Sequence, residues 1–274
     1  MTTPQPAQSA ATQRPARRFR SVYVRRVARL TPHLVRVTFA GDELSGFQVD
    51  APVKHIKLVF PAPSQDAPAT LTAGPNGLVD PLTQQKLLMR TYTPRHFDPE
   101  ALELDVDFVL HGDGPAVNWA TTAREGAALM LAGPGGGYVV NPAIESYLIV
   151  GDASALPAIG TLVETLPATA QAQVYVEIPE AADALALTSA AQINVTWLHA
   201  GSARQAPSAS LIDVVRQTAI PDGAVLVACE ATAMRTIRKY LLEERHVPTA
   251  ALYTRGYWKI GEVNHPDHDT GEDA

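Results

Sequence analysis

The segment Arg90-Thr-Tyr-Thr-Pro-Arg95 has the residue types that grip a planar, phosphorylated ligand. Arg90 and Tyr92 are two positions apart, so in an extended strand their side chains lie on the same face. A guanidinium matches the geometry of a phosphate, and an aromatic ring can stack on a flat heterocycle. Thr93 adds a hydroxyl and a backbone N–H where the strand ends. These residues together indicate a nucleotide site, although a tyrosine in a strand usually serves packing alone.

A second segment, residues 107–120, is expected to run from a strand through a glycine turn into a helix. Pro115 suits the first helical position because no N–H is needed there, and Asp113 or Gly114 can precede it as N-cap. The unpaired N–H groups and the positive dipole end of such a helix start bind phosphate readily. The pattern predicts a pyrophosphate site, and a structural helix with Trp119 in the core is the alternative.

The first half of the chain must position both segments, and its pattern is strand-like. From Leu102 to Leu110 apolar and acidic residues alternate, which is typical of a half-buried antiparallel strand. Five similar runs lie at residues 21–27, 34–39, 53–60, 87–93 and 127–131, separated by spacers rich in Gly, Pro, Asp and Asn. Six short strands of this kind predict a closed six-stranded antiparallel β-barrel, because closure removes exposed strand edges.

The pattern changes near residue 140, after a cluster of glycine and proline. Short apolar runs without alternation indicate strands buried on both faces, and they lie at residues 147–150, 174–178, 193–198, 225–229 and 251–253. Helical segments between them, at 157–166, 211–218 and 231–245, predict a parallel sheet with crossover helices. Ligands bind such sheets at the carboxyl ends of the strands, where this chain has Gly151-Asp152, Glu177, His199, Cys229-Glu230 and Arg255.

The chain of 274 residues therefore divides into four predicted parts. Residues 1–18 are expected to form a disordered tail, 19–140 a barrel domain, 141–261 an α/β domain and 262–274 an acidic, solvated tail. The motif His265-Pro-Asp-His268-Asp269 falls in this last part, and we expect tail there and no metal site, because metal ligands need a rigid scaffold.

Composition excludes several classes of protein. The net charge of −6 argues against a nucleic-acid binder that neutralises phosphates, and a single cysteine, Cys229, rules out disulfides within the chain and cysteine-rich metal sites. The first eighteen residues lack the apolar core of a secretory signal, and no apolar run approaches the ~18 residues of a membrane span. We expect a cytoplasmic protein without a membrane span, and a monomer.

The ordered motifs resemble the siderophore-interacting protein family, flavoproteins related to the ferredoxin–NADP reductase superfamily. The resemblance rests on Arg90-Thr-Tyr-Thr-Pro-Arg95 and on the run from Val106 to Ala120, and it continues through Gly133-Pro-Gly-Gly-Gly-Tyr138 and Gly151-Asp-Ala-Ser-Ala-Leu-Pro157 to Arg255-Gly-Tyr-Trp-Lys-Ile-Gly261. Several motifs in the same order over residues 18–261 are far more specific than any one of them. The resemblance implies an FAD-binding barrel followed by a Rossmann-like NAD(P)-binding domain.

The resemblance also implies roles for individual residues. Those expected to hold FAD are Arg90, Tyr92, Thr93, Asp107, Phe108, Val109 and His111, with Pro115 and Ala116 presenting the N–H groups of a helix start. Those expected to bind NAD(P)H are Gly151, Asp152, Ser154, Ala155, Glu230, Ala231 and Met234. Tyr257 and Trp258 match an aromatic pair that covers the flavin or the nucleotide groove.

The implied reaction is FAD-dependent reduction of a ferric siderophore, which releases iron as Fe(II). Many such complexes are anionic, so a basic docking surface is expected, with Lys57, Arg255 and Lys259 as candidates beside Lys54 and His55. No side chain needs to act as an acid or base, because the flavin transfers the electrons. A general ferric-chelate or ferredoxin oxidoreductase of the same fold, and a non-catalytic siderophore-binding protein, are the alternatives.

Three positions depart from the family pattern. Ala153 stands where an acidic residue is common, Cys229 where glycine is common, and Ala200 where an arginine often follows the Trp-Leu-His stretch. Without that arginine an obvious partner for the 2′-phosphate of NADPH is missing, so NADH, NADPH and reduced ferredoxin all stay open as electron donors. We expect Cys229 to be a buried residue at a strand end and not a redox thiol.

Overall fold

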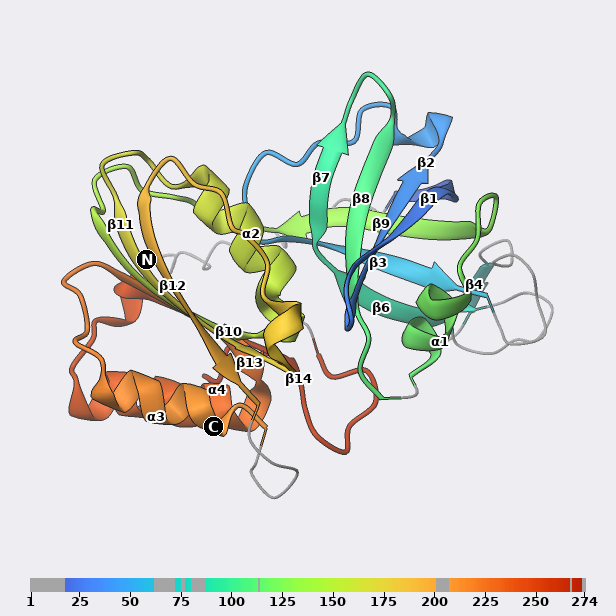
Figure 1. The fold of residues 1–274 in the computed structure, drawn as a ribbon. Coiled ribbons are helices and arrows are strands. Elements are labelled where there is room, and N and C mark those ends of the chain that lie inside the picture. Colours follow the sequence, from blue (N-terminus) through green and yellow to red (C-terminus); the bar gives the residue numbers. More distant parts are fainter. Residues whose placement is uncertain are drawn as a thin grey trace, which may run out of the picture.

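A computed structural model shows a seven-stranded antiparallel sheet followed by a five-stranded parallel sheet (Figure 1). The structure describes residues 18–61, 72–74, 77–79, 87–112, 114–200, 207–266 and 268–272. The predicted N-terminal tail lies outside the described residues except for Arg18. The predicted fold class, an antiparallel FAD-binding sheet domain followed by a parallel α/β domain, is confirmed.

The first sheet has the strand order β6-β3-β9-β1-β2-β8-β7. Its strands are β1 (Phe19–Thr31), β2 (Leu34–Ala40), β3 (Lys54–Phe60), β6 (Leu88–Tyr92), β7 (Pro94–Asp98), β8 (Glu103–Val109) and β9 (Ala128–Gly136), and a separate hairpin joins β4 (Thr72–Gly74) to β5 (Gly77–Val79). The prediction of six strands missed β7. Only Thr93 separates β6 from β7, yet these two strands lie at opposite ends of the sheet order. The chain at Thr93 thus passes directly from one edge of the curled sheet to the other.

The core of this sheet confirms the alternating pattern. Leu104, Val106 and Phe108 of β8 are almost completely buried. Helix α1 (Pro115–Thr122) covers one end of the barrel, where the ring of Trp119 lies 6.0 Å from that of Phe39 and 5.8 Å from that of Phe108. Trp119 is therefore a packing residue, and α1 is held rigidly with its N-terminus at the mouth of the barrel.

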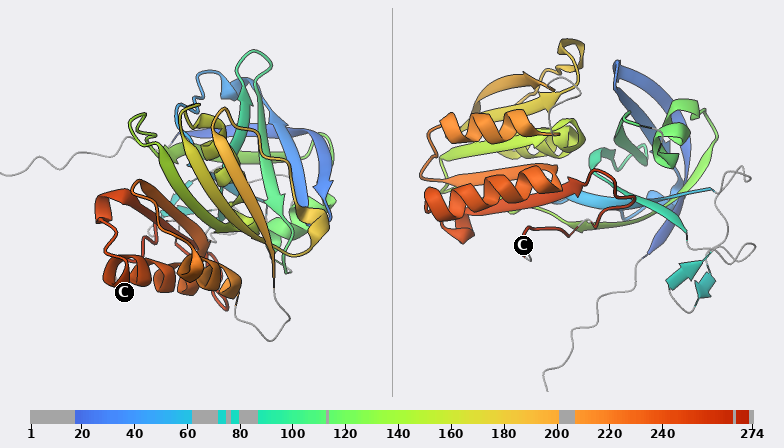
Figure 2. Two further views of the ribbon diagram at one scale, coloured as in Figure 1. Left: turned by 60° about the vertical axis from the view of Figure 1, so that its left-hand side comes forward. Right: turned by 90° about the horizontal axis from the view of Figure 1, so that it is seen from below.

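The second sheet is parallel throughout, with the order β12-β11-β10-β13-β14. Its strands are β10 (Ser146–Asp152), β11 (Gln171–Ile178), β12 (Gln192–His199), β13 (Ala224–Glu230) and β14 (Leu252–Trp258). Helix α2 (Leu156–Thr165) covers one face, and α3 (Ala209–Gln217) and α4 (Ala231–Lys239) lie side by side on the other (Figure 2). A π-helical turn, η4 (Tyr240–Glu244), extends α4. The central strands β10 and β13 are almost fully buried, as expected where helices cover both faces. The edge strands β12 and β14 were also predicted to be buried on both faces, and that was wrong, because most of their residues are partly exposed.

Helix α2 lies between the parallel sheet and the barrel and joins the two (Figure 1). The Arg95 guanidinium of β7 forms an ion pair with Glu164, and the backbone N–H of Val53 donates to the Thr161 hydroxyl at 3.1 Å. Further along the same interface, Asp183 accepts hydrogen bonds from the hydroxyl of Thr31 at 2.7 Å and from the backbone N–H of His33 at 2.9 Å. These contacts hold the two sheets on either side of one cleft.

The described residues after 261 are predicted as an acidic, solvated tail, and most of them are exposed, but several contact the rest of the protein. Asp269 accepts a hydrogen bond from the Arg235 guanidinium at 2.7 Å, and its backbone oxygen accepts one from the N–H of Gly256 in β14 at 2.9 Å. The Thr254 hydroxyl donates to the backbone oxygen of Thr270 at 2.5 Å. The segment therefore covers the free edge of β14. None of the helices in the described part of the chain is long and apolar enough to cross a membrane.

Candidate active site

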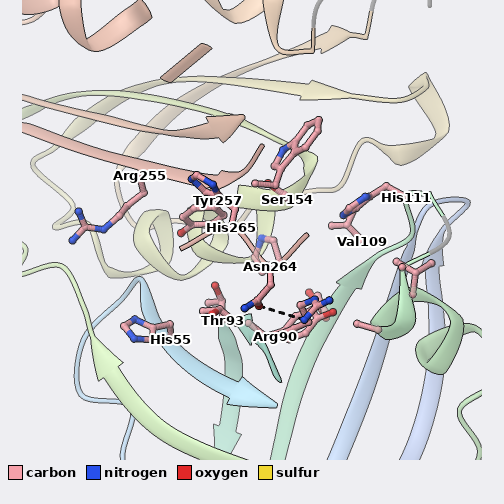
Figure 3. Close-up of a pocket in the computed structure, with 18 of the residues that line it drawn as sticks. His55, Arg90, Thr93, Val109, His111, Ser154, Arg255, Tyr257, Asn264 and His265 are labelled. Atoms are coloured by element: carbon pink, nitrogen blue, oxygen red, sulfur yellow. Dashed lines mark hydrogen bonds between the residues drawn. The ribbon is translucent and has the colours of Figure 1, made fainter. Parts of the chain in front are cut away.

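A cavity of about 560 Å³ lies between the barrel and the α/β domain (Figure 3). The barrel contributes Val53, Lys54, His55, Arg90, Thr91, Tyr92, Thr93, Asp107, Val109, His111, Gly114, Pro115, Ala116 and Val117 to its wall. The second half of the chain contributes Ser154, Pro157, Tyr253, Arg255, Tyr257, Trp258, Glu262, Val263, Asn264 and His265. The structure thus brings most of the predicted FAD residues together, and it places them opposite the predicted aromatic pair.

The end of β6 forms one wall of the cavity, because the chain crosses between sheet edges there. Tyr92 packs against Phe108, with ring centroids 4.4 Å apart, and burial raises the pKa of its phenol. The Arg90 guanidinium donates to the backbone oxygen of Met89 at 2.9 Å and to the side-chain oxygen of Asn264 at 3.3 Å. An aromatic ring held from behind and a guanidinium at the same wall suit a planar, phosphorylated ligand.

The N-terminus of α1 opens into the same cavity. Gly114 is the N-cap in an extended conformation, and no side chain of the described residues caps the helix. Pro115 has no N–H, so the N–H groups available at this helix start belong to Ala116 and Val117, which line the cavity. A helix start without a side-chain cap from the described residues, at the wall of a cavity, has the geometry that suits a phosphate.

Asp107 lies under this wall and is held by an ion pair. Its carboxylate accepts two hydrogen bonds from the Arg36 guanidinium, at 2.7 and 2.8 Å, and only 3% of its side chain is exposed. This bond is the main reason that the pKa of Arg36 is raised. Phe108, in contrast, points into the barrel core and does not line the cavity. Of the predicted strand residues, Asp107 and Val109 reach the cavity with His111.

The aromatic pair at the end of β14 forms the opposite wall. The indole N–H of Trp258 donates to Asp152 at 2.9 Å, and the ring lies 6.1 Å from that of His111. Burial raises the pKa of the Tyr257 phenol. Ser154 lies beside them and is the one predicted NAD(P)H residue at the cavity wall. A flat ligand in the cavity would lie between Tyr92 and this pair.

The other predicted NAD(P)H residues are buried and do not line the cavity; they are Gly151, Asp152, Ala155, Glu230, Ala231 and Met234. A Cβ at Gly151 would come within 2.8 Å of the backbone oxygen of Ala228, so this glycine serves close packing. The side chain of Glu230 caps α4 by accepting from the N–H groups of Thr232 and Ala233. Their role in binding a nicotinamide nucleotide stays a prediction.

The predicted docking cations differ in position. Arg255 lines the cavity, with its guanidinium 4.8 Å from the Tyr253 ring. Lys57 and Lys259 do not line it, but each contacts a residue that does: the Lys57 ammonium donates to the Thr91 hydroxyl at 2.5 Å, and Lys259 forms an ion pair with Glu262. Lys54 and His55 line the cavity as well, and the Lys54 ammonium forms an ion pair with Asp50.

Residues 262–265 complete the cavity, and sequence reasoning missed them. The His265 ring is 6% exposed and lies 2.7 Å from an Asp269 carboxylate oxygen and 3.1 Å from one of Glu262. Asn264 reaches Arg90 across the cleft (Figure 3). The polar composition of these residues predicts a solvated tail. The local sequence pattern does not indicate that the segment returns to the cleft.

Cys229 is fully buried, and desolvation raises its pKa well above the usual thiol range, with the carboxylates of Asp152, Glu230 and Glu177 adding to the shift. A buried thiol among carboxylates is inert, because reactive cysteines lie in electropositive, accessible sites.

The cavity wall fits FAD. Its size admits a tricyclic ring, the uncapped start of α1 suits a pyrophosphate, and Arg90 and Tyr92 stand where a phosphate and a planar ring would meet. No side chain of the described residues fills the groove; such filling would have excluded a flavin.

Family comparisons agree with this site. Residues 23–138 match the model of the siderophore-interacting FAD-binding domain, and residues 144–261 match the siderophore-interacting protein model. The predicted boundary near residue 140 falls between these two matches, although the outer limits of the four predicted parts stay a prediction.

Known relatives span almost the whole chain. The ferric vibriobactin reductase ViuB of Vibrio cholerae is 30% identical over 245 residues, covering 88% of this chain and 89% of the relative. The NADPH-dependent ferric-chelate reductase of Escherichia coli is 31% identical over 245 residues, covering 88% and 93%. A crystal structure of a siderophore utilization protein from T. fusca matches with a TM-score of 0.80 and 33% identity, covering 92% of this chain and 97% of that one. The chain belongs to the siderophore-interacting protein family, whose first domain binds FAD.

Proposed function

We propose that this protein is an FAD-dependent ferric-siderophore reductase that releases iron as Fe(II). The observation that carries the proposal is the cavity, in which a wall suited to FAD faces basic side chains at the same opening. The reductase names of the relatives from Vibrio cholerae and Escherichia coli support the same class of reaction.

Arg90 and the N–H groups of Ala116 and Val117 would hold the pyrophosphate of FAD, and Tyr92 would support its ring system. When bound, the flavin can accept two electrons as a hydride and donate them one at a time. The protein's task is then to hold the ring, to keep water from it and to leave one face open. Tyr257 and Trp258 would limit that face on the side of the α/β domain.

The substrate would dock through charge. Arg255 lines the cavity together with Lys54 and His55, and its positive charge would offset part of the repulsion of an anionic ferric complex by a protein with net charge −6. The Lys54 ammonium is paired with the Asp50 carboxylate. Hard oxygen ligands hold Fe(III) more tightly than Fe(II), so reduction loosens the complex. In the balanced reaction one dihydronicotinamide is oxidised, two ferric complexes are each reduced by one electron, and one proton is released.

The proposal does not choose between electron donors. NADH, NADPH and reduced ferredoxin are all consistent with a flavin exposed in the cleft, and a general ferric-chelate oxidoreductase would use the same wall. That the protein is cytoplasmic and monomeric, and that Lys57 and Lys259 take part in docking, are predictions on the same footing.

The test starts from the purified protein and its visible spectrum. We expect flavin absorption bands that bleach when a donor is added without oxygen, and reappear when a ferric siderophore is added, while a ferrous-specific chelator reports Fe(II). A general ferric-chelate reductase would reduce ferric citrate as fast as any siderophore. A colourless protein that binds a ferric siderophore without reducing it would overturn the proposal in favour of a binding protein.

A further inference from the structure

The chain after β14 returns to the cavity and forms a strap, which we define as residues 262–266 and 268–272. The side-chain oxygen of Asn264 accepts a hydrogen bond from the Arg90 guanidinium at 3.3 Å, so the strap reaches the barrel wall (Figure 3). Residues 262–265 form part of the cavity wall. The strap therefore crosses the cleft at the cavity that is proposed to hold FAD.

The far end of the strap is attached to the α/β domain. The Asp269 carboxylate accepts from the Arg235 guanidinium at 2.7 Å, and its backbone oxygen accepts from the N–H of Gly256 at 2.9 Å. A Cβ at Gly256 would lie only 2.6 Å from Oδ2 of Asp269, so the glycine leaves room for this carboxylate. Glu272 pairs with Arg238 at 3.7 Å. Strand β14 and helix α4 thus hold one end of the strap, and Arg90 holds the other.

His265 lies at the centre of the strap, between two carboxylates. Its Nε2 is 2.7 Å from Oδ2 of Asp269 and its Nδ1 is 3.1 Å from Oε2 of Glu262, and only 6% of the side chain is exposed. Hydrogen bonds from Lys259 and His265 lower the pKa of Glu262, which keeps this carboxylate ionised. Ionised carboxylates only accept, and a neutral imidazole has one N–H. Only the doubly protonated ring can therefore donate to both.

The cations nearest to these carboxylates are Lys259, paired with Glu262, and Arg235, paired with Asp269. The strap also carries His268. Histidines change charge near neutral pH, so any pH effect at this cavity must be assigned by substitution. The titratable groups that line the rest of the cavity wall are Lys54, His55, Arg90, Tyr92, Asp107, His111, Tyr253, Arg255 and Tyr257.

The contact between the strap and Arg90 leaves room for a phosphate. Among the described residues, the partners of the Arg90 guanidinium are the backbone oxygen of Met89 and the side chain of Asn264, and both are bound through Nη1. The Nε and Nη2 groups can donate to a phosphate at the same time. The strap and a bound FAD can therefore share Arg90.

We infer that the strap closes over bound FAD and that the doubly protonated ring of His265 holds it closed, so that FAD leaves more slowly when His265 is protonated. The inference rests on the placement of FAD in this cavity under the proposed function. His265 is a positioning residue, since it acts through the strap. When its ring loses a proton, one carboxylate loses its donor and faces a nitrogen lone pair. The closed state binds the proton more tightly than the open state, so closure weakens as the pH rises.

The first experiment measures release of FAD from the unmodified holoenzyme. The rise in flavin fluorescence after dilution is followed at pH values from about 5.5 to about 9, a range that spans the titration of histidine. We expect the release rate to increase about tenfold with rising pH, because a charge-assisted hydrogen bond is lost. A release rate that is constant over this range, or that falls with rising pH, would overturn the inference.

Three variants assign the pH effect. His265→Gln cannot carry a positive charge, so we expect fast release at every pH. In Glu262→Gln the amide NH2 can donate to Nδ1 of a neutral ring whose Nε2–H donates to Asp269, so release should be slow at every pH. His96→Gln is the matched control, because His96 is exposed on β7 and does not line the cavity, and it should behave as the unmodified protein. A tenfold pH response that persists in His265→Gln or in Glu262→Gln would assign the effect to another group and overturn the inference.

A second measurement follows the strap without FAD. The N–H of Gly256 donates to the backbone oxygen of Asp269, so its hydrogen exchange reports whether the strap lies on β14. In the apoprotein, peptides that contain residues 252–258 are compared by mass spectrometry at one pH near 6. We expect faster exchange in His265→Gln than in the unmodified protein and in His96→Gln. Equal exchange in all three would show that His265 does not hold the strap.

Failure of the inference can be told apart from failure of the proposed function. A protein that binds flavin and reduces a ferric siderophore, but releases FAD at a rate independent of His265, would refute only the role of the strap. A protein that binds no flavin would refute the proposed function, and with it the closure over FAD, whatever the exchange of Gly256 shows.

Discussion

The ion pair beneath the cavity gives a quantitative prediction for Arg36→Met. Asp107 is 3% exposed and accepts two hydrogen bonds from a guanidinium that is 29% exposed. Breaking a fully buried pair by removing one partner costs about 3–5 kcal/mol, because the remaining charge stays buried without compensation. Since Arg36 is partly exposed and water can reach the site, we expect a loss of about 2–3 kcal/mol in the free energy of unfolding.

Differential scanning calorimetry measures this loss. In a protein of this size it corresponds to a fall in Tm of about 5–10 °C. The matched control is Arg26→Met, which removes a guanidinium that is 57% exposed and paired with Glu103, and should cost about 1 kcal/mol or less.

A double variant tests the cause of the loss. In Arg36→Met with Asp107→Leu both charges are gone, so most of the lost stability should return. Two results would show that the unpaired, buried Asp107 carboxylate is not the cause of the loss. One is an equal fall in Tm in Arg36→Met and Arg26→Met, and the other is a double variant that is no more stable than Arg36→Met.

Three further changes test the site and the interface. Arg90→Ala should raise the Kd of FAD about tenfold to a hundredfold, through loss of a charge-assisted phosphate contact, measured by flavin fluorescence on release. Arg255→Glu should raise KM for an anionic ferric complex and leave bound FAD unchanged. Burial opposes ionisation of Asp183, but hydrogen bonds from Thr31 and His33 outweigh it and lower its pKa, so its stabilising effect is present above the ordinary value of 3.8 and is lost as the pH falls below it. Asp183→Asn should therefore lower the urea midpoint at pH 6 and make it less sensitive to acid.

Surface variants provide the controls for these measurements. Arg29→Ala and Lys239→Glu change exposed charges away from the cavity wall and should leave FAD affinity and KM as they are. An unchanged Kd in Arg90→Ala would exclude this residue from FAD binding, and a KM in Arg255→Glu equal to that in Lys239→Glu would exclude Arg255 from docking. An acid response of Asp183→Asn identical to that of the unmodified protein would mean that another group sets it.

Local sequence patterns predicted most of the secondary structure of this protein. The alternation from Leu102 to Leu110 predicted a half-buried strand, because only one side of a barrel strand meets the core. The five apolar runs after residue 140 predicted the five parallel strands, although only the inner strands are buried on both faces and the edge strands β12 and β14 are partly exposed. Arg90, Tyr92 and Pro115 could be predicted to lie at one ligand cavity, which they line, because strand spacing and helix-start chemistry act over a few residues.

Only the tertiary structure decided where the polar groups at the cleft find their partners. Asp152 is predicted to bind the nucleotide, and that role stays a prediction. The structure shows that its carboxylate accepts hydrogen bonds from the backbone N–H of Glu230 and the indole N–H of Trp258, 78 and 106 residues away along the chain. Residues 262–265 were predicted as tail and instead complete the cavity. A carboxylate at a strand end can cap a helix or bind a ligand, and the neighbouring residues in the sequence can be the same in both cases. The choice depends on which distant donors the fold places within hydrogen-bond distance, and that information is absent from any local pattern.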